Sequence, residues 1–294
     1  MSARTVDREH PFASFARGPA GERLHKGRVG TFLGAWKARA YIRIIGSNRE
    51  LSWIFFETVL PLLSIIAYLY IYRYLGAPDR FVSFVVLGGA MVAFWLSVLW
   101  GIANHIFWEK QSGNLELYFV APVSPLALML GMATGSLVST TTRASASVIA
   151  GVLLFGATFN GEGVLPSLAV LGVTLGAIYF LGMMFASLFL MYGREGEHLA
   201  HSMQEPVFFA AGFYYPLNTL PLAVQVAGSF IPLTIGLDAM RQLLVPGTVG
   251  FLPLGLEAVI LVLMFFLFAA GARQSVRFME HLAKREGRLT LRWQ

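Results

Sequence analysis

The sequence predicts an all-α polytopic membrane protein with six transmembrane helices and both termini in the cytoplasm. Of its 294 residues, 56% are hydrophobic and only 13% are charged, whereas soluble domains average about 25% charged residues. Several uncharged runs reach the roughly 20 residues that a helix needs to cross a bilayer. The chain has no cysteine, which excludes disulfides, thiolate metal sites and a cysteine nucleophile.

The distribution of basic residues predicts the orientation. With both termini inside, the inside segments hold 18 of the 22 Lys and Arg residues, and the outside segments hold only Arg80 and Arg241. This asymmetry is typical of cytoplasmic loops and requires an even number of crossings. Since the net charge of +6 is concentrated at the two ends of the chain, it indicates topology and not nucleic-acid binding.

The chain begins with a polar segment, 1–30, predicted to be a disordered cytoplasmic tail because it lacks the apolar region of a signal peptide. Residues 31–50 follow as an amphipathic interfacial helix, in which Arg39 and Arg43 are expected to extend to lipid headgroups. The alternative is a cytoplasmic extension of the first span. The apolar stripe of this helix consists of Phe32, Leu33, Trp36, Ala40 and Ile44.

A transmembrane domain is predicted over 51–272, followed by a basic cytoplasmic tail, 273–294. Residues 206–237 carry no charge but contain four prolines, which a single straight helix does not tolerate. We therefore expect a fifth span to about 217 and then broken or re-entrant helices to about 250. The other spans are predicted at 52–74, 81–108, 126–157, 164–192 and 251–272, with a polar loop at 193–202.

Three ionisable residues, Glu57, Arg143 and Glu257, lie at or near membrane depth, where each requires a partner or a wet cavity. Arg143 lies in a band of hydroxyl residues in the third span. It either bonds to carbonyls or to one of the two glutamates, or it faces the translocation path and meets an anionic headgroup. Phe208 and Phe209, in the fifth span, are further candidates for lining that path.

The segment 107–124 is short, charged and interrupted by Gly and Pro between two long apolar runs, so it lies outside the lipid. Glu109, Gly113 and Glu116 fall near one helical face. This combination favours docking onto a partner over a solvated connecting loop. Lys110 adds a charge, Pro122 redirects the chain into the third span, and the apolar anchors are Leu115, Tyr118 and Phe119.

Several catalytic motifs are absent from the sequence. There is no Gly-x-x-x-x-Gly-Lys-Ser/Thr loop for nucleotide phosphates, no His-Glu-x-x-His and no Gly-x-Ser-x-Gly. His198 and His201 are three residues apart, but a solvated turn accounts for them better than a metal site. No metal or cofactor is therefore expected on this chain, and we do not expect it to be an enzyme.

Two stretches together resemble the membrane subunit of type-2 ABC exporters, which move polysaccharides, lipids and drugs. The first is Glu109-x-x-x-Gly113-x-Leu115-Glu116, followed by Ala121-Pro122-Val-Ser124. The second is Gly212-Phe-Tyr-Tyr-Pro216-Leu-Asn-Thr-Leu220-Pro221, continuing with Ile231-Pro232-Leu-Thr-Ile-Gly-Leu-Asp238-Ala-Met-Arg241. The resemblance covers about 40–275.

The resemblance implies a plasma-membrane (inner-membrane) subunit that pairs with a second copy or a close homologue. Two ATP-binding-cassette subunits would bind ATP and Mg²⁺, and 109–124 would be the coupling helix that inserts into them. Residues 212–245 would form short outer helices that cap the exit path. In that cap, Asp238 and Arg241 are expected to pair at the outer rim, with Tyr215, Pro216 and Pro232 shaping the turns.

For the substrate, amphipathic compounds such as drugs or lipids are favoured over polysaccharide, because the spans lack a long ladder of aromatic and polar positions. Two other classes stay open. A transporter or channel driven by an ion gradient would need no ATPase, and an intramembrane enzyme would need converging polar groups at one depth. Whether the pair is a homodimer or a heterodimer stays open too.

Overall fold

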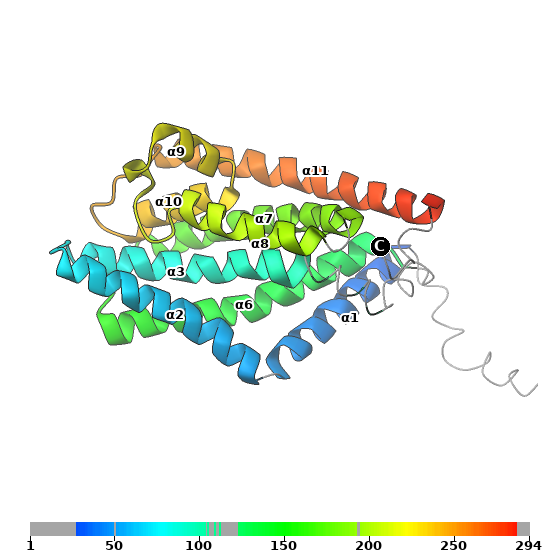
Figure 1. Cartoon of the computed structure of the whole chain (residues 1–294), viewed down its shortest axis with the longest axis horizontal. Helices are drawn as coiled ribbons and strands as arrows, with labels where there is room; N and C mark the ends of the chain where they lie inside the picture. The colour runs from blue at the N-terminus through cyan, green and yellow to red at the C-terminus, as the bar shows by residue number, and fades with distance from the viewer. Residues whose placement is uncertain are drawn as a thin grey trace, which may run out of the picture.

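Long apolar helices run alongside one another through most of the molecule in the computed structural model (Figure 1). The structure describes residues 28–49, 51–103, 105, 109, 112, 123–192 and 195–286, and this part of the chain contains helices and no strand. The long helices are α2 (Leu51–Tyr74), α3 (Arg80–Val98) with its π-helical continuation η3 (Leu99–Ala103), α6 (Pro125–Phe155), α7 (Val164–Tyr192) and α11 (Leu254–Glu286).

Shorter helices lie at and between the ends of this bundle. They are α1 (Arg28–Arg49), α8 (Glu195–Ala210), the 3-10 turn η4 (Leu217–Thr219), α9 (Leu222–Ser229) and α10 (Pro232–Leu244). α9 and α10 meet at an angle of 101°. The prediction of broken helices in this proline-rich region is therefore confirmed.

Four of the described helices are long and apolar enough to cross a membrane: α3 with η3, α6, α7 and most of α11. A fifth is reached if the bent pair α9–α10 counts as one span. The described helices are those expected of a membrane-embedded protein. The prediction of six spans also counts α2 and α8. Both helices are present, but their described residues are not long and apolar enough to cross a membrane by the same measure.

The third and fourth predicted spans agree closely with α6 and α7. α6 begins at Pro125, a residue favoured in the first helical turn, and ends at Gly156, whose positive φ of 72° is that of a left-handed helix cap. The uncharged composition of these stretches and the Pro and Gly residues at their ends are therefore sufficient to place these two helices.

Three predicted helix boundaries are wrong: the start and the end of α8 and the end of α11. The region predicted as a polar loop, 193–202, is helical from Glu195, and α8 continues through Pro206 to Ala210 instead of reaching 217. α11 is also longer than predicted, because it continues from the predicted end at 272 to Glu286. Polarity marks where a helix leaves apolar surroundings, but the backbone hydrogen bonds of the helix continue into water without penalty.

α3 is the central helix, and it packs against α2, α6, α7 and α10. In its most apolar stretch 83% of the residues are buried, whereas in that of α11 only 11% are. The core around α3 includes Phe94, Trp95 and Val98, together with Met183 on α7 and Phe213 after α8. The exposed apolar face of α11 is the kind of surface that lipid or another subunit covers.

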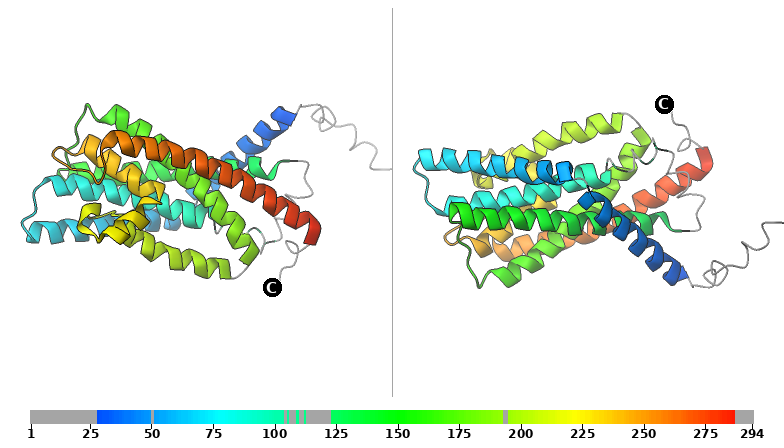
Figure 2. Two further views of the ribbon diagram at one scale, coloured as in Figure 1. Left: turned by 90° about the horizontal axis from the view of Figure 1, so that it is seen from above. Right: turned by 90° about the horizontal axis from the view of Figure 1, so that it is seen from below.

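The two ends of the bundle carry different elements (Figures 1 and 2). One end, named the α1 end, contains the starts of α1, α6 and α8 and the ends of α7 and α11. The opposite end, named the α10 end, contains the turn between α2 and α3, the connection from α6 to α7, and α9 and α10. The described parts of the segments predicted to be cytoplasmic and external thus lie at opposite ends of the bundle.

Candidate functional site

At the α1 end, the start of the predicted coupling segment is held against α1. The Arg39 guanidinium donates from Nη2 to Oε1 of Glu109, 70 residues away in the chain. His105, one turn before Glu109, places its Nε2 3.2 Å from the same oxygen. Glu109 is only 8% exposed, so its carboxylate is directed into the protein.

The rest of the predicted coupling residues lie outside the described part of the chain. These are Lys110, Gly113, Leu115, Glu116, Tyr118, Phe119 and Pro122. Glu109 is thus the member of the set whose position is known, and its described contacts are to the subunit's own side chains.

α1 packs closely along α6. A Cβ atom added to Gly131 would lie 2.7 Å from the Trp36 carbonyl oxygen, and one added to Gly135 would lie 2.7 Å from Cβ of Arg43. Trp36 also donates its Nε1 hydrogen to Oγ1 of Thr134 at 3.1 Å. Two glycines four residues apart allow helices to approach this closely, so Gly131-x-x-x-Gly135 was a signal in the sequence for this contact.

Arg43 connects α1 to the π-helical turn of α3. Its Nη2 donates to the Gly101 carbonyl oxygen at 3.1 Å, and its Nε donates to Oγ of Ser136 at 3.0 Å. A π-helical turn departs from the ordinary backbone hydrogen-bond pattern and often marks a functional position. The expectation that Arg39 and Arg43 extend to lipid headgroups is therefore wrong, because both guanidinium groups have partners inside the protein.

The same π-helical turn contacts α8. The Trp100 indole donates from Nε1 to Oε1 of Gln204 at 3.1 Å. Its ring also packs edge to face with the His201 ring, with ring centres 4.5 Å apart. η3 thus lies between α1 and α8 and contacts both. His201 packs on an aromatic ring, and among the described residues no group of three His, Asp or Glu side chains is arranged to hold a metal ion.

The candidates for the translocation path lie on two helices, α6 and α8. Arg143 is half-buried on α6, and Glu257 is not its partner, because that carboxylate accepts from Nε2 of Gln242 at 2.8 Å at the α10 end. Phe208 packs its ring edge against Phe213 inside the subunit, with ring centres 5.6 Å apart. Phe209 is 53% exposed, so it is the phenylalanine of this pair that faces outward.

At the α10 end, Arg241 is buried and bonds to backbone carbonyls. Its Nη1 donates to the oxygen of Gly212 at 2.8 Å, and its Nη2 donates to those of Phe213 and Phe84. The guanidinium carbon also lies 3.4 Å from the centre of the Phe84 ring. Arg241 thereby fixes the turn after α8 to α3, since the planar guanidinium reaches several acceptors at once.

The predicted pair between Asp238 and Arg241 is wrong. Asp238 accepts instead from the backbone N–H of Phe251 at 2.6 Å, which ties α10 to the loop before α11. Both side chains are buried, so they are not at a rim of the subunit. Their spacing of three residues places the two side chains on neighbouring positions of α10. Each charge nevertheless bonds to backbone groups outside α10: Asp238 to the N–H of Phe251, and Arg241 to carbonyl oxygens.

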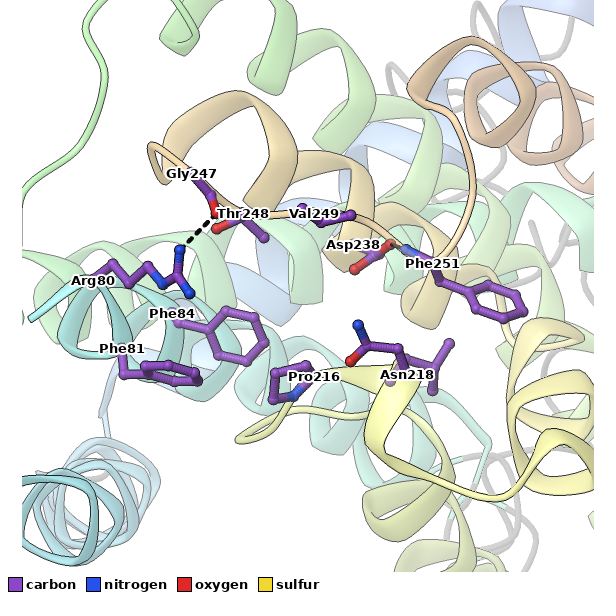
Figure 3. Close-up of a pocket in the computed structure, with 11 residues that line it drawn as sticks. Arg80, Phe81, Phe84, Pro216, Asn218, Asp238, Gly247, Thr248, Val249 and Phe251 are labelled. Atoms are coloured by element: carbon purple, nitrogen blue, oxygen red, sulfur yellow. Dashed lines mark hydrogen bonds between the residues drawn. The ribbon is translucent and has the colours of Figure 1, made fainter. Parts of the chain in front are cut away.

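A cavity of about 310 Å³ lies beside Asp238 (Figure 3). Arg80 lines one side and donates to the Gly247 carbonyl oxygen at 2.7 Å. Phe81 and Phe84 form an aromatic wall, and Pro216 and Asn218 face them. The remaining predicted cap residues shape the backbone: Pro232 opens the first turn of α10, and the Tyr215 hydroxyl donates to the Phe209 carbonyl oxygen.

Comparison with known proteins identifies the family. No curated protein matches the chain. The sequence model of the family described as ABC-2 type transporter matches residues 35–245, which include α2, α3, α6, α7, α8 and α10 and most of α1. The matched range also contains Glu109 and Arg241 with the hydrogen-bond partners named above. Since this match covers well over half of the sequence, the chain belongs to the ABC-2 type transporter family and is a membrane subunit of such a transporter.

Proposed function

We propose that this subunit exports an amphipathic or hydrophobic compound, such as a drug or a lipid, using ATP hydrolysed on a separate subunit. In this proposal six helices cross the cell's inner (plasma) membrane, and α2 and α8 complete the set. The α1 end faces the cytoplasm and the α10 end faces outward. Two such subunits, identical or closely related, assemble with two ATP-binding-cassette subunits.

The observation that carries the proposal is the contact of Glu109 with Arg39 and His105. The segment that begins at Glu109 is the one expected to meet the ATPase. Because the buried carboxylate of Glu109 is bonded to α1, a displacement of the segment is passed to α1 without an intervening loop.

From α1 the displacement has two routes into the bundle. One is the close packing of α1 on Gly131 and Gly135 of α6. The other is the bond from Arg43 to the Gly101 carbonyl in the π-helical turn, whose neighbour Trp100 bonds to α8. α6 and α8 carry Arg143 and Phe209, so both routes end on helices with residues proposed to face the path.

The outward-facing apolar surface supports assembly with a second subunit and an apolar substrate. On α11, Val262, Leu263, Phe266 and Leu267 are exposed, and Phe209 is exposed on α8. Lipid covers part of such a surface in any membrane protein. In the proposal the substrate moves along the part that the second subunit encloses.

The test reconstitutes the subunit with its ATP-binding-cassette partner in lipid vesicles and measures ATP hydrolysis with and without the membrane subunit. Glu109→Ala removes the carboxylate that Arg39 and His105 share. We expect the stimulation of ATP hydrolysis to fall about tenfold, the size of an ordinary coupling free energy. Glu162→Ala is the matched control, because Glu162 is an exposed carboxylate at the α10 end.

A charge exchange distinguishes loss of coupling from loss of folding. Arg39→Glu combined with Glu109→Arg restores an ion pair in the opposite sense, so the double variant recovers stimulation that either single variant lacks. Wild-type stimulation in Glu109→Ala would overturn the coupling role. Export by the membrane subunit alone, with no partner ATPase in the vesicles, would overturn the proposed class of transporter.

A further inference from the structure

A groove of about 680 Å³ opens at the α1 end, and Arg39, Glu109 and Arg241 do not line it. Its walls come from the start of α1, the start of α6 and the last third of α11, which all lie at this end of the bundle (Figure 2). The lining residues are Val29, Thr31, Phe32, Leu33, Val123, Ser124, Pro125, Leu126, Arg273, Val276 and Arg277.

One wall of the groove is cationic. Arg273 and Arg277 are one helical turn apart on α11, with Val276 between them on the same face. Both arginines are exposed, and neither forms a hydrogen bond or an ion pair with any residue in the described part of the chain. No Asp or Glu is among the described residues that line the groove, so none of these residues neutralises the two charges.

The part of the groove formed by α1 and α6 is largely apolar. Val29 and Leu33, also one turn apart, are 72% and 42% exposed on α1, and Phe32, Pro125 and Leu126 extend the apolar surface. Exposed aliphatic side chains and a pair of guanidinium groups that line one groove match an amphiphile with an anionic head. They do not match a small inorganic anion, which would leave the apolar wall without a partner.

The depth of the groove in the membrane points to the same occupant. After Glu257, near the start of α11, the helix has no charged residue until Arg273. At 1.5 Å per residue, this uncharged run spans most of a hydrocarbon core of about 30 Å. Arg273 and Arg277 therefore lie at the level of the headgroups, where basic pockets between helices bind anionic lipids.

We infer that this groove is a binding site for an anionic phospholipid of the cytoplasmic leaflet. The phosphate lies between Arg273 and Arg277, and the glycerol and upper acyl chain lie against Val29, Phe32 and Leu33. A lipid held there bridges α1 and α11, so it restrains the helix that also holds Glu109. The choice of leaflet rests on the proposed orientation of the subunit, but the binding chemistry does not.

The experiment measures lipid binding to the purified full-length chain in detergent by native mass spectrometry, without any ATPase. The probes are phosphatidylglycerol and phosphatidylcholine with the same acyl chains. Each basic residue near an anionic lipid contributes about a factor of five to binding, so Arg273→Gln with Arg277→Gln lowers phosphatidylglycerol affinity about 30-fold. Phosphatidylcholine binding, which lacks the net charge, changes much less.

A matched pair of charge-removing substitutions serves as the control. Lys37→Gln with Arg49→Gln removes two exposed cations of α1 that do not line the groove, and we expect phosphatidylglycerol binding to stay at the wild-type level. Leu33→Asn places an amide on the apolar wall and is expected to weaken phosphatidylglycerol binding while leaving both arginines in place.

Three outcomes would overturn the inference. They are equal losses in the groove and control variants, no preference for phosphatidylglycerol over phosphatidylcholine, and displacement of the lipid by excess inorganic phosphate, which would assign the site to a free anion. Since no ATPase is present, a failure here is separate from a failure of the coupling proposal, and intact binding with lost coupling is equally distinguishable.

Discussion

Each end of the bundle contains an arginine with little solvent exposure, and the two are bonded in different ways. At the α1 end Arg39 pairs with Glu109, a side chain on a segment that connects two helices. At the α10 end Arg241 donates to the carbonyl groups of Gly212, Phe213 and Phe84 and lies over an aromatic ring. One contact joins two side chains, and the other joins a side chain to the backbone.

The difference indicates which end is suited to movement. Two side chains can separate and pair again by changing rotamers, with modest loss when water or another partner replaces them. Backbone carbonyls buried around a guanidinium group have no such replacement, and leaving a buried acceptor unsatisfied costs about 1–3 kcal/mol. We therefore expect the α10 end to act as a fixed frame and the α1 end to be the adjustable one.

The largest expected effect comes from removing the arginine of the frame. Arg241→Met leaves the carbonyls of Gly212 and Phe213 without their donor in a site where Arg241 is only 2% exposed. We expect the unfolding free energy to fall by about 3 kcal/mol or more. Thermal unfolding of the purified protein in detergent, followed by tryptophan fluorescence, measures it.

Arg241→Lys is expected to recover little of the lost stability, because an ammonium group lacks the planar fork that reaches several carbonyls. Arg80→Gln is the control, since Arg80 is an exposed arginine at the same end whose one carbonyl partner among the described residues is Gly247. We expect it to change stability by about 0.5 kcal/mol or less. Equal effects of the two substitutions would contradict the fixed frame.

A smaller effect is expected where α1 meets α6. Gly135→Ala adds a Cβ atom that would lie 2.7 Å from Cβ of Arg43 and 2.8 Å from the Ala40 carbonyl oxygen. Overpacking of this kind costs about 1–3 kcal/mol, and the adjustable end has room to move α1 away. We therefore expect the main loss in stimulated ATP hydrolysis, with a modest drop in the unfolding temperature.

Gly172→Ala on α7 is the matched control, because an added Cβ atom there meets nothing within 4 Å. Alanine favours a helix over glycine by about 1 kcal/mol, so this variant should be at least as stable as the wild type. A Gly135→Ala protein that unfolds as early as Arg241→Met would show that the α1 end is as rigid as the frame.

The smallest effect is expected in the π-helical turn. Trp100→Phe keeps an aromatic ring near His201 but removes the hydrogen bond to Gln204, at a cost of about 1 kcal/mol. Gln204→Met removes the same bond from the other side. If this bond accounts for both losses, the double variant is no less stable than either single one in thermal unfolding, and additive losses would exclude a shared contact.

Much of the fold could be predicted from local features of the sequence. Uncharged runs and the residues that interrupt them predicted the ends of α6 and α7 to within two residues. This works because lipid requires each stretch of helix to be apolar and to satisfy its own backbone hydrogen bonds, independently of its neighbours. The proline-rich region predicted the break between α9 and α10. Helix ends in polar surroundings, at Glu195 and Glu286, were not predictable, because polarity does not stop a helix.

For the candidate sites, the sequence identified the residues and the tertiary structure identified their partners. Glu109, Asp238 and Arg241 stood out because charged groups are rare in this chain. Their partners lie far along it: Glu109 bonds across 70 residues to Arg39, and Arg241 bonds across 157 residues to Phe84. Charge and spacing alone determine that a buried group needs a partner, but only the packing of helices decides which donor or acceptor is close enough to provide one.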